Sequence, residues 1–116
     1  MKTVYIAHPI GGDVENNIKR VLSIVSGINL SEMHIHPFAP YLVDLMTLND
    51  NIPSHREKGM AHNEKMLRCG IIDEVWLYGD RISNGMLREI EIAEEMGIPV
   101  LAMSESTIKE RFNKFL

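Results

Sequence analysis

The chain has 116 residues, of which 45% are hydrophobic and 24% charged, a composition that fits one globular domain with no room for a second. Its formal net charge of −4 gives no electrostatic footprint for a nucleic-acid polymer or an anionic membrane, so neither is predicted as a partner. The single cysteine excludes an internal disulfide framework, and the amino terminus runs directly into a strand-like segment, which predicts a cytoplasmic protein.

The amino-terminal segment predicts a strand, a loop and a helix. Residues 3–7 form a nearly continuous run of β-branched and aromatic side chains, as expected for a strand with both faces covered. Asp13 is a suitable N-cap for a helix whose apolar residues recur at helical spacing, and Gly27 predicts its end. The loop between them is rich in proline and glycine and consists of His8, Pro9, Ile10, Gly11 and Gly12.

The second predicted strand covers residues 34–38 and is interrupted by Pro37, with Pro40 following it. Because proline cannot donate a hydrogen bond to a neighbouring strand, this strand is expected to be short or to lie at a sheet edge. Residues 42–48 then predict one or two helical turns, followed by a polar loop over residues 49–54.

A longer helix is predicted over residues 56–68, with Met60 and Leu67 facing inward. Asn63 and Glu64 fall close to that inward line. We interpret them first as the polar edge of an amphipathic helix, with a position facing a cleft or a partner subunit as the alternative.

The last third of the chain predicts strands over residues 73–78 and 99–103, with a helix that ends at Gly97 between them. A final amphipathic helix is predicted to reach residue 115, with Ser106 or Thr107 as its N-cap.

Strands that alternate with helices in this way predict right-handed crossovers and an α/β fold. We expect a single-domain Rossmann-like three-layer sandwich with a parallel sheet of four to five strands. Ligands bind such sheets beyond the carboxyl ends of the strands, where the strand order reverses. Residues 8–12 and 79–85 are therefore expected to converge in one crevice.

Glu89 is the most unusual residue in the pattern. A carboxylate on the apolar face of a helix is costly unless it is paired, hydrogen-bonded or used in chemistry. A structural glutamate held by Arg81, Arg88 or a backbone donor is one interpretation, and a functional carboxylate is the other. The apolar residues that flank it on a helical wheel are Met86, Ile90, Ile92, Ala93 and Met96.

Three segments carry a resemblance to a known family. They are residues 7–12 (AHPIGG), residues 73–76 (DEVW) and residues 83–100, which begin SNGMLRE and end GIPV. Together they resemble the nucleoside 2-deoxyribosyltransferase-like superfamily, and more narrowly a small branch of phage and bacterial proteins within it. The resemblance extends over nearly the whole chain, which implies one such domain over residues 1–116.

The resemblance implies specific roles for site residues. A Gly-x-x-x-Glu motif in the family delivers a glutamate that attacks C1′ of the sugar, and Gly85 and Glu89 match that spacing. A serine upstream of the motif glycine binds 5′-phosphate in nucleotide-cleaving relatives, which implies this role for Ser83 beside Asn84. An acidic residue before the third strand has its counterpart in Asp73. The loop after the first strand binds base, sugar or phosphate, which implies substrate binding by His8, Pro9, Ile10, Gly11 and Gly12.

Two residues depart from the family pattern. Met86 stands where transferases carry a small residue, and Glu91 stands where they carry glycine. We therefore keep two functions open. The first is N-glycosidic bond cleavage or deoxyribosyl transfer on a nucleoside or nucleoside 5′-monophosphate. The second is a non-catalytic module that binds a nucleotide in the same crevice as a sensor or sequestering protein.

A phosphoribohydrolase on a related fold is a third interpretation, but its phosphate loop rich in proline and glycine is missing before Gly85. The family resemblance also implies a homo-oligomer, a dimer or larger. No cofactor is predicted. His34 and His36 would project from one strand face at a spacing that can bind metal, but no third ligand stands at a suitable spacing, so no metal site is predicted. Tyr78 is first a core residue of a strand, and its place near the strand end makes it a candidate to reach a base. Arg56 is first a solvated arginine at a helix start, with neutralisation of a phosphate as the alternative.

Overall fold

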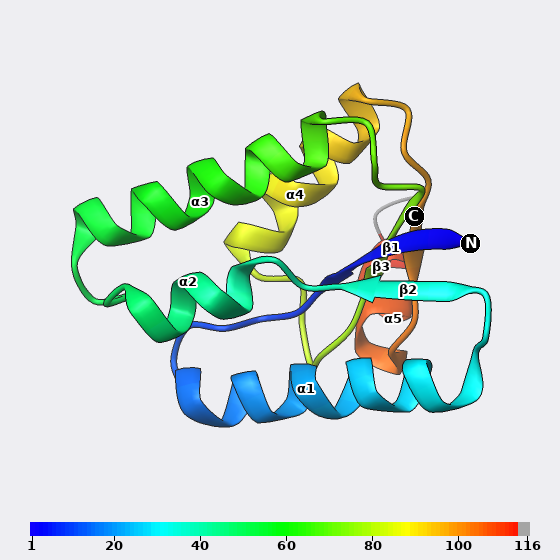
Figure 1. The fold of residues 1–116 in the computed structure, drawn as a ribbon, viewed down its shortest axis with the longest axis horizontal. Helices are drawn as coiled ribbons and strands as arrows, with labels where there is room; N and C mark the ends of the chain where they lie inside the picture. The colour runs from blue at the N-terminus through cyan, green and yellow to red at the C-terminus, as the bar shows by residue number, and fades with distance from the viewer. Residues whose placement is uncertain (114–116) are drawn as a thin grey trace.

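The computed structural model describes residues 1–113 and contains one sheet with helices on both sides (Figure 1). All neighbouring strands pair in parallel, in the order β2-β1-β3-β4. The elements along the chain are β1 (Lys2–Ala7), α1 (Val14–Ser31), β2 (Ile35–Phe38), α2 (Tyr41–Thr47), α3 (Pro53–Arg68), β3 (Glu74–Leu77), α4 (Asn84–Glu95), β4 (Val100–Ala102) and α5 (Glu105–Asn113).

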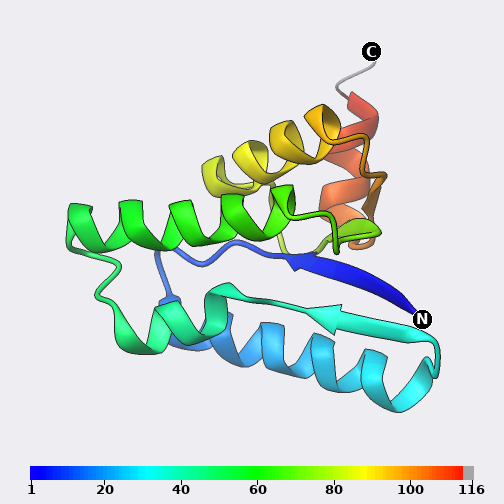
Figure 2. The same ribbon diagram turned by 45° about the horizontal axis from the view of Figure 1, so that its top comes forward.

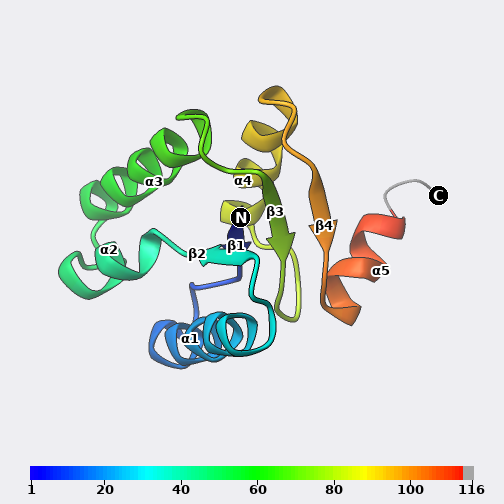
Figure 3. The same cartoon turned by 45° about the vertical axis from the view of Figure 1, so that its right-hand side comes forward.

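The two faces of the sheet are covered by different helices (Figures 2 and 3). Val4 and Ile6 of β1 are fully buried and pack with Ile28 of α1 on one face. The alternate residues of β1, Tyr5 and Ala7, belong to the larger core on the other face, which includes buried residues of α3 and α4. This alternation along a central strand confirms the predicted three-layer α/β sandwich, with four strands in the sheet.

The predictions for the middle of the chain are largely confirmed. Among the described strands, β2 lies at the sheet edge and pairs with β1, where Pro37 stands opposite Val4. The segment that follows forms the two turns of α2. α3 begins at Pro53, three residues earlier than predicted, because proline at the first helical position lacks only an N–H that would have no partner there.

Gly27 does not end α1, contrary to the prediction. The helix continues to Ser31, and Ile28 on its extra turn is only 8% exposed against Val4 and Ile6. A glycine inside a helix costs about 1 kcal/mol relative to alanine, and burying an isoleucine contributes more than that.

The cap of the final helix also differs from the prediction. α5 begins at Glu105, and the Ser104 hydroxyl accepts a hydrogen bond from the backbone N–H of Thr107 at 3.3 Å. Thr107 is itself fully buried and donates to the carbonyl of Leu77. The predicted end of this helix at residue 115 lies outside the described residues.

The loops after β1 and β3 meet at the carboxyl edge of the sheet, as predicted. The chain leaves β1 toward β2 on one side, and β3 lies on the other side of β1, so the strand order reverses between them. Gly79 has a φ of +97°, and a Cβ there would lie 2.5 Å from Cδ of Pro9. Only glycine permits this close approach of the two loops. None of the helices within residues 1–113 is long and apolar enough to cross a membrane.

Candidate functional site

A cavity of about 610 Å³ opens at the carboxyl edge of the sheet, on the face covered by α3 and α4. We call it the Glu89 cavity. Its walls come from the loop after β1, the facing sides of α2 and α3, and the first turns of α4. Most of the residues predicted for the site line it together, namely His8, Ile10, Gly11, Ser83, Asn84, Gly85 and Glu89.

Three predicted substrate-binding residues lie elsewhere. Pro9 is buried beneath Gly79, and Gly12 lines a second cavity on the α1 side of the same loops. Asp73 precedes β3 at the opposite end of the sheet, where its Oδ2 accepts a hydrogen bond from the backbone N–H of Thr3 at 2.7 Å. Because parallel strands start at one edge and end at the other, Asp73 cannot contact a ligand beside Glu89.

Tyr78 is also placed away from the Glu89 cavity. It packs with Val4 and Ile6 on the face covered by α1, so it does not reach a base held on the opposite face. Arg56 does line the cavity, as the alternative interpretation of this residue allowed.

Glu89 itself is partly buried and faces the cavity from the second turn of α4. The hydroxyl of Tyr5, on the central strand β1, donates a hydrogen bond to its Oε2. Burial raises the pKa of Glu89 to about 7, while the hydrogen bond from Tyr5 acts in the opposite direction. A carboxyl with this pKa exists in both protonation states near neutral pH.

Neither arginine considered as a partner in the sequence holds Glu89. Arg88 turns to α3 and pairs with Glu64 at 3.0 Å, and with Glu91 at 3.5 Å. Arg81 pairs with Asp80 at 3.0 Å and donates to the carbonyl of Gly11 at 3.3 Å. Among the described residues, the neutral hydroxyl of Tyr5 is the partner of Glu89.

The two departures from the family pattern have local explanations. Met86 is 1% exposed, and its sulfur lies 3.5 Å from the backbone nitrogen of Ser83, which donates to it. The Ser83 hydroxyl in turn accepts from the Met86 N–H at 3.3 Å, so these two residues together cap α4. Glu91 is exposed and pairs with Arg88. Of these two residues, Met86 therefore lines the Glu89 cavity and Glu91 does not.

The apolar part of the α2–α3 wall was not predicted from the sequence as part of the site. Leu45, Leu48 and Met60 give it an apolar surface, and Asn63 adds an amide. Asn63 Oδ1 is buried and has no hydrogen-bond partner among residues 1–113. The structure therefore favours the alternative interpretation of Asn63, as a residue facing a cleft, over a solvated helix edge.

Two buried tyrosines form a support behind Glu89 that sequence reasoning also missed. Tyr5 and Tyr41 have ring centroids 6.0 Å apart, and the Tyr41 hydroxyl donates to the carbonyl of Ile6. Burial raises the pKa of both hydroxyls well above the usual value, so both remain protonated donors. A tyrosine in a strand buried on both faces needs a hydrogen-bond partner, which is the signal that could have linked Tyr5 to Glu89.

A metal centre finds no support in the part of the chain that the structure describes, because no group of three or more His, Cys, Asp or Glu side chains lies within reach of one ion.

No curated protein matches the sequence. A family model, described as Domain of unknown function (DUF7768), matches residues 2–103. This match includes every element from β1 to β4, and with them both loops and Glu89. The chain therefore belongs to the DUF7768 family.

Proposed function

We propose that the protein cleaves the N-glycosidic bond of a nucleoside or nucleoside 5′-monophosphate, or transfers its deoxyribosyl group, with Glu89 as the nucleophile. The observation that supports this most is the Glu89 carboxylate, which faces a cavity while a buried tyrosine holds its Oε2. The resemblance to nucleoside 2-deoxyribosyltransferases assigns the same residue the same role.

The reaction proceeds in two displacements on C1′ of the sugar. An oxygen of Glu89 forms a bond to C1′ as the bond from C1′ to the base nitrogen breaks, and the base leaves with the electron pair and takes up a proton. Water, or the nitrogen of a second base, then attacks C1′ and releases Glu89 as a carboxylate. The two displacements together retain the configuration at C1′.

The environment of Glu89 determines the pH range in which its carboxylate is ionised and can attack C1′. Only the ionised carboxylate is nucleophilic, and its pKa of about 7 means that the ionised fraction rises through neutral pH. The Tyr5 hydroxyl stabilises the ionised form and fixes the orientation of the carboxylate. We expect base release to increase between about pH 6 and pH 8, with a midpoint near 7.

The cavity has a size and surface suited to this class of substrate. Its volume of about 610 Å³ lies within the range of roughly 300–1,000 Å³ found for small-molecule sites. Leu45, Leu48 and Met60 offer the apolar faces against which a base can stack, and Asn63 offers an amide for its polar edge.

A binding module that holds a nucleotide intact is the second candidate. It is favoured by the raised pKa of Glu89, because the carboxyl is protonated below about pH 7 and then donates a hydrogen bond to a ligand instead of attacking it. A sensor or sequestering protein would use the same cavity walls.

A substrate panel separates the two candidates. Deoxy- and ribonucleosides and their 5′-monophosphates are incubated with the protein, and free base is measured by chromatography. Glu89→Gln keeps the size of the side chain and should abolish release, whereas Glu91→Gln removes a charge two residues away on the exposed side and should retain it. Thermal stabilisation by a ligand that is recovered intact, in the wild type and in Glu89→Gln, would instead identify a binding module.

The family resemblance also leads us to propose a homo-oligomer whose neighbouring subunit borders the Glu89 cavity. Val43 and Met46 on α2 are 68% and 77% exposed, and they stand on the helix that forms one wall of this cavity. A subunit contact over α2 would cover them. Light scattering that gives the mass of a single chain would contradict this proposal.

A further inference from the structure

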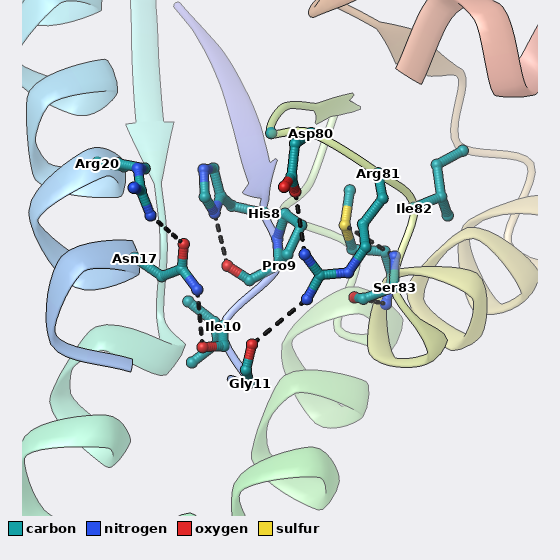
Figure 4. A network of polar contacts seen from close by, with 12 residues as sticks. His8, Pro9, Ile10, Gly11, Asn17, Arg20, Asp80, Arg81, Ile82 and Ser83 are labelled. Carbon is teal, nitrogen blue, oxygen red and sulfur yellow. Dashed lines mark hydrogen bonds and ion pairs between the residues drawn. The ribbon is translucent and has the colours of Figure 1, made fainter. Parts of the chain in front are cut away.

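A second cavity, of about 650 Å³, lies on the α1 side of the loops that border the Glu89 cavity. We call it the Arg20 cavity. It shares His8, Gly11 and Arg81 with the Glu89 cavity. In the same loops, Arg81 donates a hydrogen bond to the Gly11 carbonyl (Figure 4). The function proposed for Glu89 makes no use of this cavity.

Arg20 is held in place at the Arg20 cavity by a buried relay (Figure 4). Asn17 is 6% exposed, and its Nδ2 donates to the carbonyl of Ile10 in the loop after β1, at 2.9 Å. The Oδ1 of the same amide accepts from the Arg20 guanidinium, also at 2.9 Å. A long cationic side chain on a helix surface is thereby oriented before any ligand arrives.

This oriented cation has no acidic partner among residues 1–113. Two carboxylates line the same cavity, but each has another contact. Asp80 pairs with Arg81 at 3.0 Å, and Asp13 accepts from the Asn16 side chain at 2.9 Å. Arg20 forms no ion pair with either of them, so its positive charge is available to an anion.

His8 presents a second, different group to the Arg20 cavity. His8 is 7% exposed, and its Nδ1 lies 2.6 Å from the carbonyl oxygen of Pro9. A carbonyl only accepts, so Nδ1 carries the hydrogen, and Nε2 is left as an acceptor without a partner in the described chain. The charged groups that act on the ring are those of this cavity, namely Arg20, Asp80 and Arg81, and burial lowers its pKa.

The start of α1 borders the same cavity. Gly12 and Asp13 line the cavity directly before the helix, and Asp13 provides no side-chain cap to the first-turn amides. Free amides at a helix start favour anions. The cavity thus combines an oriented guanidinium, the backbone at the start of α1 and the unpartnered Nε2 of His8.

We propose that the Arg20 cavity binds a phosphorylated sugar, with its phosphate on Arg20 and the amides of Gly12 and the first turn of α1, and with a sugar hydroxyl donating to Nε2 of His8. An anion alone would leave the His8 acceptor unused, and a neutral sugar would leave the guanidinium unused. This site is separate from Glu89 and stands whether or not Glu89 cleaves a glycosidic bond.

Titration calorimetry of the full chain with ribose 5-phosphate tests the proposal. Arg20→Gln should weaken binding by roughly tenfold or more, since it removes charge-assisted hydrogen bonds. Lys19→Gln removes the same charge one residue earlier, from a side chain that is 69% exposed, and should change the affinity less than twofold. Ribose without the phosphate should bind at least tenfold more weakly than ribose 5-phosphate.

Equal affinities for wild type, Arg20→Gln and Lys19→Gln would overturn the proposal, as would the absence of any binding of ribose 5-phosphate to the wild type at millimolar concentration. A loss of affinity in Ser83→Ala but not in Arg20→Gln would also overturn it, because the phosphate would then lie at the start of α4. Glu89→Gln should bind ribose 5-phosphate as the wild type does. A failed base-release assay would therefore remove the proposed function and leave this result intact.

Discussion

α4 and α1 both begin at the carboxyl edge of the sheet, on opposite faces, but their first turns are built differently. The start of α4 is closed, because the Ser83 hydroxyl and the Met86 thioether each accept a hydrogen bond from a backbone N–H in a reciprocal cap. The start of α1 is open, because Asp13 makes no side-chain cap. The closed start supports an embedded carboxylate, and the open start stands beside an unpaired cation.

This difference suggests how one parallel sheet can serve two chemistries at one edge. Glu89 depends on a precise orientation, which a capped helix and the buried Tyr5 hydroxyl provide. Anion binding depends instead on donors that are still free, which an uncapped helix and Arg20 provide. The loops that meet at Gly79 border both spaces through His8, Gly11 and Arg81.

The largest effect is expected from adding a side chain at Gly79, where the two loops meet. Gly79→Ala would place a Cβ 2.5 Å from Cδ of Pro9 at a φ of +97°, so the loops must separate. We expect the free energy of unfolding to fall by about 2–4 kcal/mol, measured by urea denaturation. Gly70→Ala is the matched control, since its φ is +90° but nothing lies within 4 Å of the added carbon. An equal loss in both variants would show that the loop contact is unimportant.

The next effect concerns the stability cost of ionising Glu89. Its pKa rises from 4.5 to about 7 on folding, so the folded state binds more protons in that interval and stability falls as the pH rises through it. Glu89→Gln removes this dependence. The variant should unfold with a free energy higher by on the order of 2 kcal/mol at pH 8, with no gain below about pH 4.

Urea denaturation of both proteins from pH 4 to pH 8 measures that difference. A gap between wild type and Glu89→Gln that does not change with pH would contradict the environment described for the carboxyl.

The parts of this site that depend on neighbouring residues in the chain could be predicted from the sequence, and the parts that depend on contacts between distant segments could not. The loop glycines and the place of Glu89 on a helix were predictable, because turn chemistry and helical period are local properties of the sequence. The hydrogen bond from Tyr5 was not predictable, because Tyr5 on β1 and Glu89 on α4 are 84 residues apart in the chain. The position of Arg20 beside the loop depends in the same way on tertiary contacts of Asn17.

Two errors have the same origin. Gly27 carries a local stop signal, but packing of Ile28 against β1 continues the helix beyond it. Asp73 was transferred to the site from the family resemblance alone, whereas the direction of β3 places it at the other end of the sheet. Local sequence signals were sufficient to predict the helices and strands, whereas packing against the sheet and the direction of its strands determine which residues are in contact.

A smaller effect is expected from removing the hydrogen bond to Glu89. Tyr5→Phe deletes the donor that lowers the pKa of the carboxyl, so this pKa should rise above about 7. The midpoint of base release against pH should shift upward by roughly one pH unit. Tyr41→Phe, whose hydroxyl donates to the Ile6 carbonyl and not to Glu89, should leave the midpoint unchanged. A midpoint that is equal in wild type and Tyr5→Phe would argue against the proposed role of Tyr5.

The smallest effect separates the two helix starts directly. Ser83→Ala should lower the free energy of unfolding by about 1 kcal/mol, because it removes an N-cap acceptor. Asp13→Ala should cost less than about 0.5 kcal/mol, because Asp13 does not cap α1 with its side chain, and its side-chain partner within residues 1–113 is the exposed Asn16. Equal losses in thermal or urea unfolding would show that the two starts do not differ as described.

The nucleophilic role of Glu89 is tested most directly by mass spectrometry of the protein quenched during turnover of a nucleoside or nucleotide. The account predicts a protein whose mass is increased by that of the glycosyl group, with the added mass on the peptide that contains Glu89 and absent from Glu89→Gln. Base release that continues in Glu89→Gln, with no glycosylated protein in the wild type, would contradict it.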